Sequence, residues 1–294
     1  MTTVITSFAD RGGVGKTTVA MMLAHGLSAI HGKNVLCIDL DDTPRLSQAM
    51  LGRQAHMMAR VQSRTLSQII ASAALGAPAD PCPSIKTQVG MIRGLKGPAP
   101  LALLPGDERI TDQVLTLIGH LSRGNNAPST ADAKDMIQLA IRKVIETVKT
   151  AYDCLVIDGP PRDNVLIRGA ISASDLVVMP YMPGPGSGVV LAETIAIAAP
   201  YEVKALAVPN MVQNSAGFGH KNRIDELQGA YPHLLDMSGA PFAMKLVPQL
   251  ANIIEAPETS DLTAKDRYGS ALSTVKALCE LVSKELHVKA KEAA

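Results

Sequence analysis

One stretch of this 294-residue chain decides its fold: Asp10-Arg11-Gly12-Gly13-Val14-Gly15-Lys16-Thr17-Thr18. It follows a short apolar run, Thr3–Phe8, and precedes a longer helical pattern, Thr17–Ala29. Glycine has no Cβ, so it permits a turn in which several backbone N–H groups converge on one point. The helix that follows adds the positive end of its dipole to those groups. The stretch therefore predicts a strand, an anion-binding loop and a helix in direct succession.

Short apolar runs alternate with longer helical patterns along the rest of the chain, which indicates strands alternating with helices. The apolar runs are continuous rather than alternating in hydrophobicity, as expected for strands covered on both faces. The expected strands are Thr3–Phe8, Val35–Leu40, Leu101–Leu104, Cys154–Ile157, Leu176–Tyr181, Val203–Val208 and Phe242–Val247. The expected helices are Thr17–Ala29, Thr65–Ala74, Ile110–Leu121, Ala131–Thr150, Gly188–Ala198 and Ser270–Leu286. The sequence thus predicts an α/β fold with a mostly parallel, twisted sheet covered by helices on both faces.

Two looser segments interrupt this alternation. Residues 76–100 contain five prolines, and residues 124–130 read Gly-Asn-Asn-Ala-Pro-Ser-Thr. Proline removes a backbone donor and interrupts helices and strands, so both segments are expected to be surface excursions. Because strands are predicted on both sides of the two segments, residues 1–294 are expected to form a single domain.

Composition limits the classes of protein to which the chain can belong. Hydrophobic residues make up 47% and charged residues 19%, so a sizeable core is expected rather than disorder. The four cysteines lie far apart and form no CxxC pair, which disfavours a zinc or iron–sulfur site. No signal peptide is apparent, and no apolar window reaches the roughly 18 residues needed to cross a bilayer. A soluble, cytoplasmic protein is expected.

The glycine-rich stretch carries the chemistry of phosphate binding. In such a loop Lys16 would reach the β- and γ-phosphates of a nucleotide, and the Thr17 hydroxyl would ligate Mg²⁺. The strict pattern G-x-x-x-x-G-K-[ST] requires glycine at position 10, where this chain has Asp10. The stretch instead resembles the deviant Walker A motif of the ParA/MinD family, K-G-G-x-G-K-[ST]-T.

This resemblance implies a P-loop ATPase that uses ATP and Mg²⁺. Arg11 stands where the family has its signature lysine, which reaches across a face-to-face homodimer to the partner's nucleotide. Arginine keeps the charge but is longer, planar and forked, so it changes the geometry of that contact. The resemblance implies catalytic roles for Lys16 and Arg11. The residues that would bind the nucleotide are Gly12, Gly13, Val14, Gly15, Lys16, Thr17 and Thr18.

A second predicted strand ends in carboxylates, in the segment Val35-Leu-Cys-Ile-Asp39-Leu-Asp41-Asp42. Ligands bind at the carboxyl ends of parallel strands in open α/β sheets. The segment resembles the D-x-D motif of the family, which implies that Asp41 is a catalytic residue that positions the attacking water. Asp39 would then support Mg²⁺ or the loop. Helix capping or solvation is the alternative for Asp41 and Asp42.

A third apolar strand also ends in aspartate, in Tyr152-Asp153-Cys154-Leu155-Val156-Ile157-Asp158-Gly159-Pro160-Pro161. A carboxylate in this place supports Mg²⁺, often through water. The segment resembles the family's Y-D-x-x-x-x-D-x-P-P pattern, the Walker B arrangement. The resemblance implies that Thr17, Asp39 and Asp158 form the metal site, and that Gly159 senses the γ-phosphate.

The base of the nucleotide is the next question. The chain contains no proper match to the [NT]KxD motif that reads guanine, which favours ATP. In the family an adenine-contacting Asn follows a late strand, and Asn210 occupies the corresponding place. Pro248, which closes the next predicted strand, resembles the second adenine-side position. A simple strand-ending turn is the alternative for both residues.

In the ParA/MinD family, an ATP-bound dimer holds nucleoid DNA or a membrane until a partner protein triggers slow hydrolysis. The C-terminal helical pattern lacks Phe and Trp and includes glutamates, so it is expected to pack on the core rather than anchor in a membrane. Between Leu51 and Pro100 the basic residues outnumber the one acidic residue, Asp80, and further basic residues follow in two later segments. The basic residues of these three segments are Arg53, Arg60, Arg64, Lys86, Arg93, Lys96, Lys221, Arg223, Lys276, Lys284, Lys289 and Lys291.

Such charges can neutralise phosphates without reading bases, although solvated surface lysines are the alternative. The sequence therefore predicts a nucleoid-associated partition ATPase that binds nonspecific DNA in its ATP state and is stimulated by a ParB-like or other adaptor protein. Two alternatives remain open. One is a MinD-like positioning ATPase on a membrane or scaffold, and the other is a nucleotide-bound scaffold that hardly hydrolyses ATP.

Overall fold

The computed structural model describes residues 2–90, 92–94, 97–98, 100–182, 186–210, 262–263, 265, 268–269 and 272–292. These residues form a seven-stranded sheet in which β3 pairs antiparallel with β6 and every other pair is parallel. The order across the sheet is β3 (Lys86–Thr87), β6 (Leu101–Leu104), β2 (Val35–Asp39), β7 (Cys154–Asp158), β1 (Thr3–Ser7), β8 (Leu176–Tyr181) and β9 (Lys204–Pro209). The predicted α/β fold with a mostly parallel sheet is confirmed.

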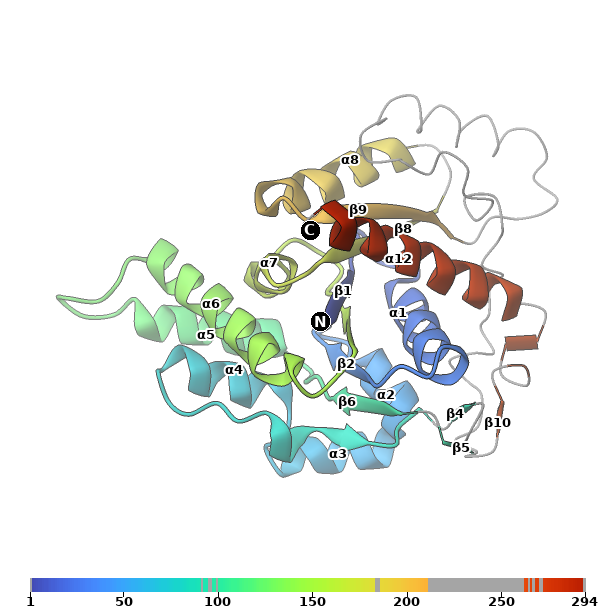
Figure 1. Cartoon of the computed structure of the whole chain (residues 1–294). Helices are drawn as coiled ribbons and strands as arrows, with labels where there is room; N and C mark the ends of the chain where they lie inside the picture. The colour runs from blue at the N-terminus through green and yellow to red at the C-terminus, as the bar shows by residue number, and fades with distance from the viewer. Residues whose placement is uncertain are drawn as a thin grey trace.

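Helices cover both faces of this sheet (Figure 1). On one face lie α1 (Lys16–His25), its π-helical continuation η1 (Gly26–Ile30) and α12 (Leu272–Glu292). On the other face lie α5 (Ile110–Leu121), α6 (Thr130–Lys149) and α7 (Val165–Ser172). All residues of β2, β6, β7 and β8 are buried. This two-sided burial is the reason that the strands carry continuous apolar runs.

The remaining elements surround the sheet. The helices are α2 (Arg45–Leu51), α3 (Arg53–Val61), α4 (Leu66–Ala74) and α8 (Ser187–Ala198), with the short 3₁₀ helices η2 (Cys82–Ser84) and η3 (Ala199–Tyr201). A small second sheet has the order β10 (Leu262–Thr263), β4 (Ile92–Gly94) and β5 (Gly97–Pro98). The segment predicted as an excursion at 76–100 thus supplies β3 to the edge of the main sheet, together with β4 and β5. The predicted strand Phe242–Val247 lies outside the described residues.

The C-terminal helix packs on the core, as its composition predicted. Val275, Leu278 and Val282 of α12 are fully buried. A Cβ on Gly26 would collide with the Sγ of Cys279 and would lie 2.9 Å from Cγ1 of Val275, so glycine is required where η1 meets α12. Within the described part of the chain, no helix is both long and apolar enough to span a membrane.

The strand order brings three chain segments together at one edge of the sheet. β7 lies between β1 and β2, with Asp158 in register with Ser7 on one side and Asp39 on the other. β1 in turn lies between β7 and β8, so the connections that leave β1 and β7 cross to different sides. In open α/β sheets, ligands bind at the carboxyl ends of the strands beside such a reversal of strand order.

Candidate functional site

The loop between β1 and α1 leaves backbone donors available to an anion. Gly13 and Gly15 have φ angles of +76° and +93°, which favour glycine because other residues are strained there. Gly15 is the N-cap of α1, and no side chain caps the first N–H groups of that helix. The loop borders a hollow of about 360 Å³ lined by Gly12, Gly13, Gly15, Lys16, Thr17, Thr18, Asp41, Thr43, Arg45 and Pro161.

Lys16 lies in this hollow among acidic groups. Its side chain is largely buried, and its Nζ donates a hydrogen bond of 2.8 Å to the carbonyl oxygen of Arg11. Burial lowers the pKa of Lys16, against the opposing effects of Asp158, Asp41 and Asp10. The ammonium group is therefore held by its own loop, in a place from which it can turn to a bound phosphate.

Asp158 ends β7 with a carboxylate that lacks hydrogen bonds. The residue is completely buried, and neither carboxylate oxygen has a hydrogen-bond partner among the described residues. Burial, followed by repulsion from Asp39, raises its pKa well above the ordinary value, although the nearby Thr17 hydroxyl and Lys16 ammonium favour the charged form. A buried acceptor without a donor is costly, so this carboxylate is suited to a cation.

Asp39 ends β2 and, unlike Asp158, accepts several hydrogen bonds. Its Oδ2 accepts hydrogen bonds from the backbone N–H of Ser47 at 2.8 Å and from the Ser47 hydroxyl at 2.7 Å. Its Oδ1 accepts a third, from the N–H of Asp41 at 3.2 Å. Burial raises the pKa of Asp39 to about 7, against the lowering effect of the bonds from Ser47. Of the two roles predicted for Asp39, these contacts correspond to support of the loop.

The two aspartates that follow β2 face different partners. Asp41 is buried, lines the hollow, and accepts bonds from the N–H and the hydroxyl of Thr43 at 2.8 and 2.9 Å. Asp42 accepts a bond of 2.8 Å from the N–H of Thr111, in the first turn of α5. Asp42 therefore caps α5, which was the alternative considered for it, and Asp41 is the carboxylate placed beside the phosphate loop.

The oxygen donors at this edge fit a magnesium ion. Mg²⁺ takes oxygen ligands, and in nucleotide sites it is held by one or two carboxylates together with phosphate oxygens and water. Asp158 offers a buried carboxylate without hydrogen bonds, and Thr17 offers a hydroxyl beside it. No three His, Cys, Asp or Glu side chains gather as a metal cluster in the described ranges. Thr17 and Asp158 are thus the side chains that would hold the ion.

Asp10 explains the departure from the strict phosphate-loop pattern. Its backbone N–H donates to the Thr194 hydroxyl at 3.0 Å, and its Oδ1 accepts from the N–H of Asp163 at 2.9 Å. The side chain therefore joins the phosphate loop to the segment after β7, and the backbone joins it to α8. A glycine at position 10 could not make the side-chain bond. From the sequence, Asp10 was recognised as a departure from the strict phosphate-loop pattern, but no role was predicted for it.

The remaining predicted residues lie around the loop or beyond the described part of the chain. Arg11 is exposed, and it forms no ion pair with a described residue. Asn210 is buried at the end of β9, where its Nδ2 donates a bond of 2.7 Å to the carbonyl oxygen of Val14. Pro248 lies outside the described residues. The structure thus brings Asn210 to the phosphate loop by a direct contact with its backbone.

Three residues of the hollow were not predicted from the sequence. Thr43, Arg45 and Pro161 line it, and Arg45 is an exposed cation at the first position of α2. The position of Arg45, four residues after Asp41, was the available signal. It was missed because α2 spans only seven residues and shows too little periodicity to be predicted.

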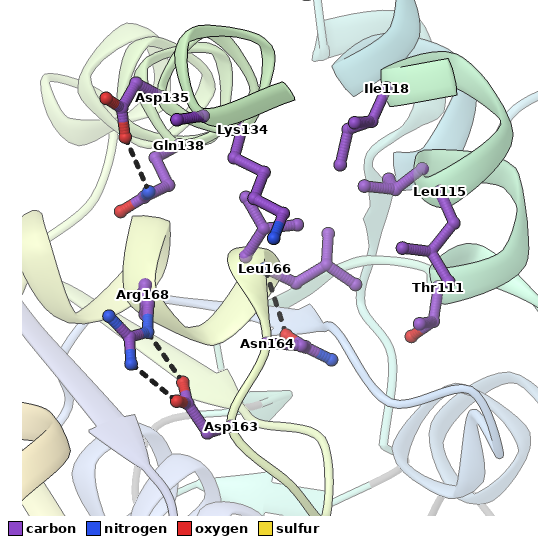
Figure 2. A pocket seen from close by; sticks show the side chains of 13 residues that line it. Thr111, Leu115, Ile118, Lys134, Asp135, Gln138, Asp163, Asn164, Leu166 and Arg168 are labelled. Atoms are coloured by element: carbon purple, nitrogen blue, oxygen red, sulfur yellow. Dashed lines mark hydrogen bonds and ion pairs between the residues drawn. The ribbon is translucent and has the colours of Figure 1, made fainter. Parts of the chain in front are cut away.

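A second hollow, of about 500 Å³, lies between α5, α6 and α7 (Figure 2). Lys134 of α6 points into it, and Arg168 of α7 forms hydrogen bonds of 2.8 and 2.6 Å with Asp163 (Figure 2). Asp163, which lines this second hollow, is hydrogen-bonded to Asp10 of the phosphate loop. Several of its polar side chains are already paired with one another, whereas the first hollow combines uncapped backbone donors with a buried lysine.

The glycine loop, the acidic strand ends and the strand order together define a P-loop NTPase. A family model described as an AAA domain matches residues 2–191, which is more than half of the chain. The chain belongs to this family and is a P-loop ATPase of the ParA/MinD type.

Sequence comparison identifies a relative that is similar to this chain over part of its length. The sporulation initiation inhibitor protein Soj of Bacillus subtilis is 26% identical over 171 residues, which cover 58% of this chain and 54% of Soj. The chain thus aligns with little more than half the length of this relative.

Solved structures extend the likeness of the fold over nearly the whole chain. A putative plasmid partition protein from Borrelia burgdorferi B31, bound to AMPPNP, has a TM-score of 0.66 at 15% identity, covering 97% of this chain and 100% of that one. The pNOB8 ParA protein, bound to nonspecific DNA, has a TM-score of 0.63 at 17% identity, covering 100% of both chains. At these identities the comparison concerns the fold alone.

Proposed function

We propose that this protein is a positioning ATPase that forms a homodimer with ATP and Mg²⁺, holds nonspecific DNA in that state, and releases it on hydrolysis. A ParB-like or other adaptor protein would stimulate the hydrolysis, and residues 1–294 would act as one nucleoid-associated domain. The observation that carries the proposal is the hollow in which the phosphate loop, the buried Lys16 and the carboxylate of Asp41 meet. The solved pNOB8 ParA, which is bound to nonspecific DNA, supports the choice of surface.

The residues of the hollow divide the chemistry of hydrolysis among them. The loop N–H groups and the Lys16 ammonium would bind the phosphates and stabilise the charge that develops on the leaving group. A magnesium ion held by Thr17 and Asp158 would add positive charge at the phosphates. Asp41 would orient the attacking water and accept a hydrogen bond from it. Asn210, anchored to Val14, and Pro248 would frame the adenine side.

The exposed Arg11 supports a role for the dimer. An arginine at the rim of a nucleotide site, without an ion pair among the described residues, is free to contact a phosphate supplied across an interface. Dimerisation would also double every weak contact with DNA. Lys276 and Lys284 are exposed on α12, where they are available to phosphates.

Cosedimentation with nonspecific duplex DNA tests the proposal directly. The protein is mixed with DNA in the presence of ADP, ATP or a nonhydrolysable ATP analogue, at several salt concentrations. Binding is expected only with ATP or its analogue and should weaken steeply with salt, because phosphate contacts release counterions. Lys16→Ala should lose both the dimer and the DNA. Equal binding in all nucleotide states, or none in any, would overturn the proposed DNA switch.

A further inference from the structure

Helix α3 presents an apolar face to solvent. The exposed fractions of Met57, Met58 and Val61 are 59%, 47% and 71%. These residues occupy neighbouring positions on one side of the helix, because residues four apart fall on the same face. The opposite side carries His56 and Ala59, which are buried against the protein. The helix therefore has a normal inner face and, in addition, an outer face of large apolar side chains.

A groove lies at the edge of this face. It has a volume of about 530 Å³, and its walls combine apolar side chains with two glutamines and one lysine. The lining residues are Leu51, Gly52, Gln54, Ala55, Met58, Ala59, Gln62 and Lys86. Met58 belongs to both the exposed face and the groove, so the two form one continuous surface. This surface, the outer face of α3 with its groove, is called the α3 surface below.

The charge of the α3 surface is positive. The sequence contains no acidic residue between Asp42 and Asp80, whereas Arg45, Arg53, Arg60 and Arg64 fall within that interval. Arg60 is engaged by Asp107 at 3.2 Å and Glu108 at 3.0 Å. Arg53 and Arg64 are exposed, and neither forms an ion pair with any residue of the described ranges.

We propose that the α3 surface binds an acidic, apolar helical segment of a partner protein. Methionine side chains adapt to the shape of an apolar ligand, and the arginines at the ends of the face would pair with its carboxylates. DNA would use the arginines but would leave Met57 and Val61 in water. A second copy of this chain, paired about a two-fold axis, would place Arg53 and Arg64 against like charges.

The α3 surface is connected to the nucleotide site by hydrogen bonds. On the inner face of α3, His56 Nε2 lies 3.0 Å from the carbonyl oxygen of Gly106. The N–H of Gly106 donates to the Ser47 hydroxyl at 2.9 Å, and that hydroxyl donates to Asp39. A segment that binds α3 would therefore act on the β2 end that positions Asp41. This consequence, unlike the binding itself, rests on the proposed function.

Designed peptides test the binding. Three fluorescent 18-residue amphipathic helices would share one leucine face and differ in the other, which is all Glu, all Gln or all Lys. Fluorescence anisotropy with the full chain is expected to give at least tenfold tighter binding of the Glu peptide than of the other two. The double variant Met57→Gln/Val61→Gln should lose at least tenfold in affinity for it. Arg53→Glu/Arg64→Glu should reverse the preference towards the Lys peptide.

Exposed residues elsewhere supply matched controls. Val189 of α8 is 63% exposed, and Arg123 is exposed after α5. Val189→Gln and Arg123→Glu should leave peptide binding unchanged. Equal affinity for the three peptides, no detectable binding, or equal losses in the control variants would overturn the proposal. Competition by duplex DNA through Arg53 and Arg64 would assign the surface to DNA instead, and binding of anionic vesicles through Met57 and Val61 would assign it to a membrane.

ATP turnover separates this proposal from the proposed function. The Glu peptide should change the turnover of the wild type at least twofold and leave that of Met57→Gln/Val61→Gln unchanged. Binding without any change in turnover would refute the connection through Gly106 while supporting the docking surface. An absence of turnover in every variant, with peptide binding intact, would count against the proposed ATPase function alone.

Discussion

The ends of β2 and β7 differ although they occupy the same level of the sheet. Asp39 and Asp158 are register partners, and both are fully buried. Asp39 accepts three hydrogen bonds from the protein, whereas Asp158 accepts none from the described residues. A carboxylate whose acceptors are filled by its own chain stabilises a loop. A carboxylate left without donors in the same surroundings is suited to a ligand that arrives later.

The chain that follows each strand explains this difference. After β2 it turns back into α2, whose Ser47 returns an N–H and a hydroxyl to Asp39. After β7 come Gly159, whose N–H is bonded to Ser7, and two prolines, Pro160 and Pro161, which have no N–H. A Cβ on Gly159 would lie 2.9 Å from the carbonyl oxygen of Ser7, so this turn is also tightly packed. The segment after β7 therefore has few donors to offer Asp158.

The largest expected effect concerns the residue that the β2 end positions. Asp41→Ala should reduce ATP turnover by about 10²-fold or more, since a lost general base or water-orienting group typically costs 10²- to 10⁴-fold. Nucleotide binding should persist, so the ATP-bound dimer should accumulate. Phosphate release and size-exclusion chromatography measure the two effects. Unchanged turnover would show that Asp41 does not position the water.

The next effect concerns the β7 end. Asp158→Asn should weaken the Mg²⁺-dependent part of nucleotide affinity by about 10- to 100-fold, in the range found when groups that support a metal are removed. In the nucleotide-free protein the same substitution should increase the free energy of unfolding at neutral pH, because burial and repulsion from Asp39 oppose ionisation of the carboxyl in the folded chain, a cost that a neutral amide avoids. Titration of a fluorescent nucleotide with and without Mg²⁺, and denaturant unfolding, measure the two effects. A nucleotide-free Asp158→Asn variant that is less stable than the wild type would contradict this difference between the two carboxylates.

The same substitution at the β2 end should be less favourable to stability. Asp39→Asn replaces one acceptor by an NH₂ group that faces existing donors, so its free energy of unfolding should lie roughly 1–3 kcal/mol below that of Asp158→Asn. Urea unfolding of the nucleotide-free protein measures this, with Asp158→Asn as the matched comparison. If the two variants have the same free energy of unfolding, the two carboxylates are not as different as their hydrogen bonds indicate.

A smaller effect is expected for the hydroxyl that links the β2 end to Gly106. Ser47→Ala should cost about 1 kcal/mol of stability, the usual net value of a hydrogen bond, and should also reduce turnover because Asp41 is less well positioned. Ser129→Ala is a suitable control, because Ser129 caps α6 far along the chain and should cost about 1 kcal/mol without changing turnover. Equal turnover in the two variants would show that Ser47 does not help to position Asp41.

The last effect is a dependence of stability on pH, spread over the range between the folded and unfolded pKa values of Asp39. Burial raises the pKa of Asp39 to about 7, whereas the unfolded chain ionises at its ordinary value near 3.8. Between these values the folded state holds a proton that the unfolded state has released. The contribution of Asp39 to stability should therefore decline as the pH rises through this range, and Asp39→Asn should flatten the decline. Unfolding free energies of the nucleotide-free protein at several pH values test the sign.

The main sheet was predictable because its signal is local. The apolar runs at Leu101–Leu104 and Leu176–Tyr181 coincide with β6 and β8, and the helical pattern Ile110–Leu121 coincides with α5. Helices α2, α3 and α7 were missed: they span only seven to nine residues, and Gly52, with a φ of +78°, divides the first two, whereas α4, also of nine residues, was predicted from its apolar pattern. Periodicity is a weak signal in such short windows.

The sequence alone determined which residue types stand at the ends of the strands, and with them the phosphate loop, the acidic strand ends and the class of fold. Glycine spacing and strand-like runs depend on neighbours along the chain, so they can be read without coordinates. Only the tertiary structure decided that Asp39 accepts hydrogen bonds from Ser47, that Asp158 accepts none from the described residues and that Asp10 joins the loop to Asp163. Those contacts join residues from different segments, and their partners follow from the order of the strands, which no local pattern specifies.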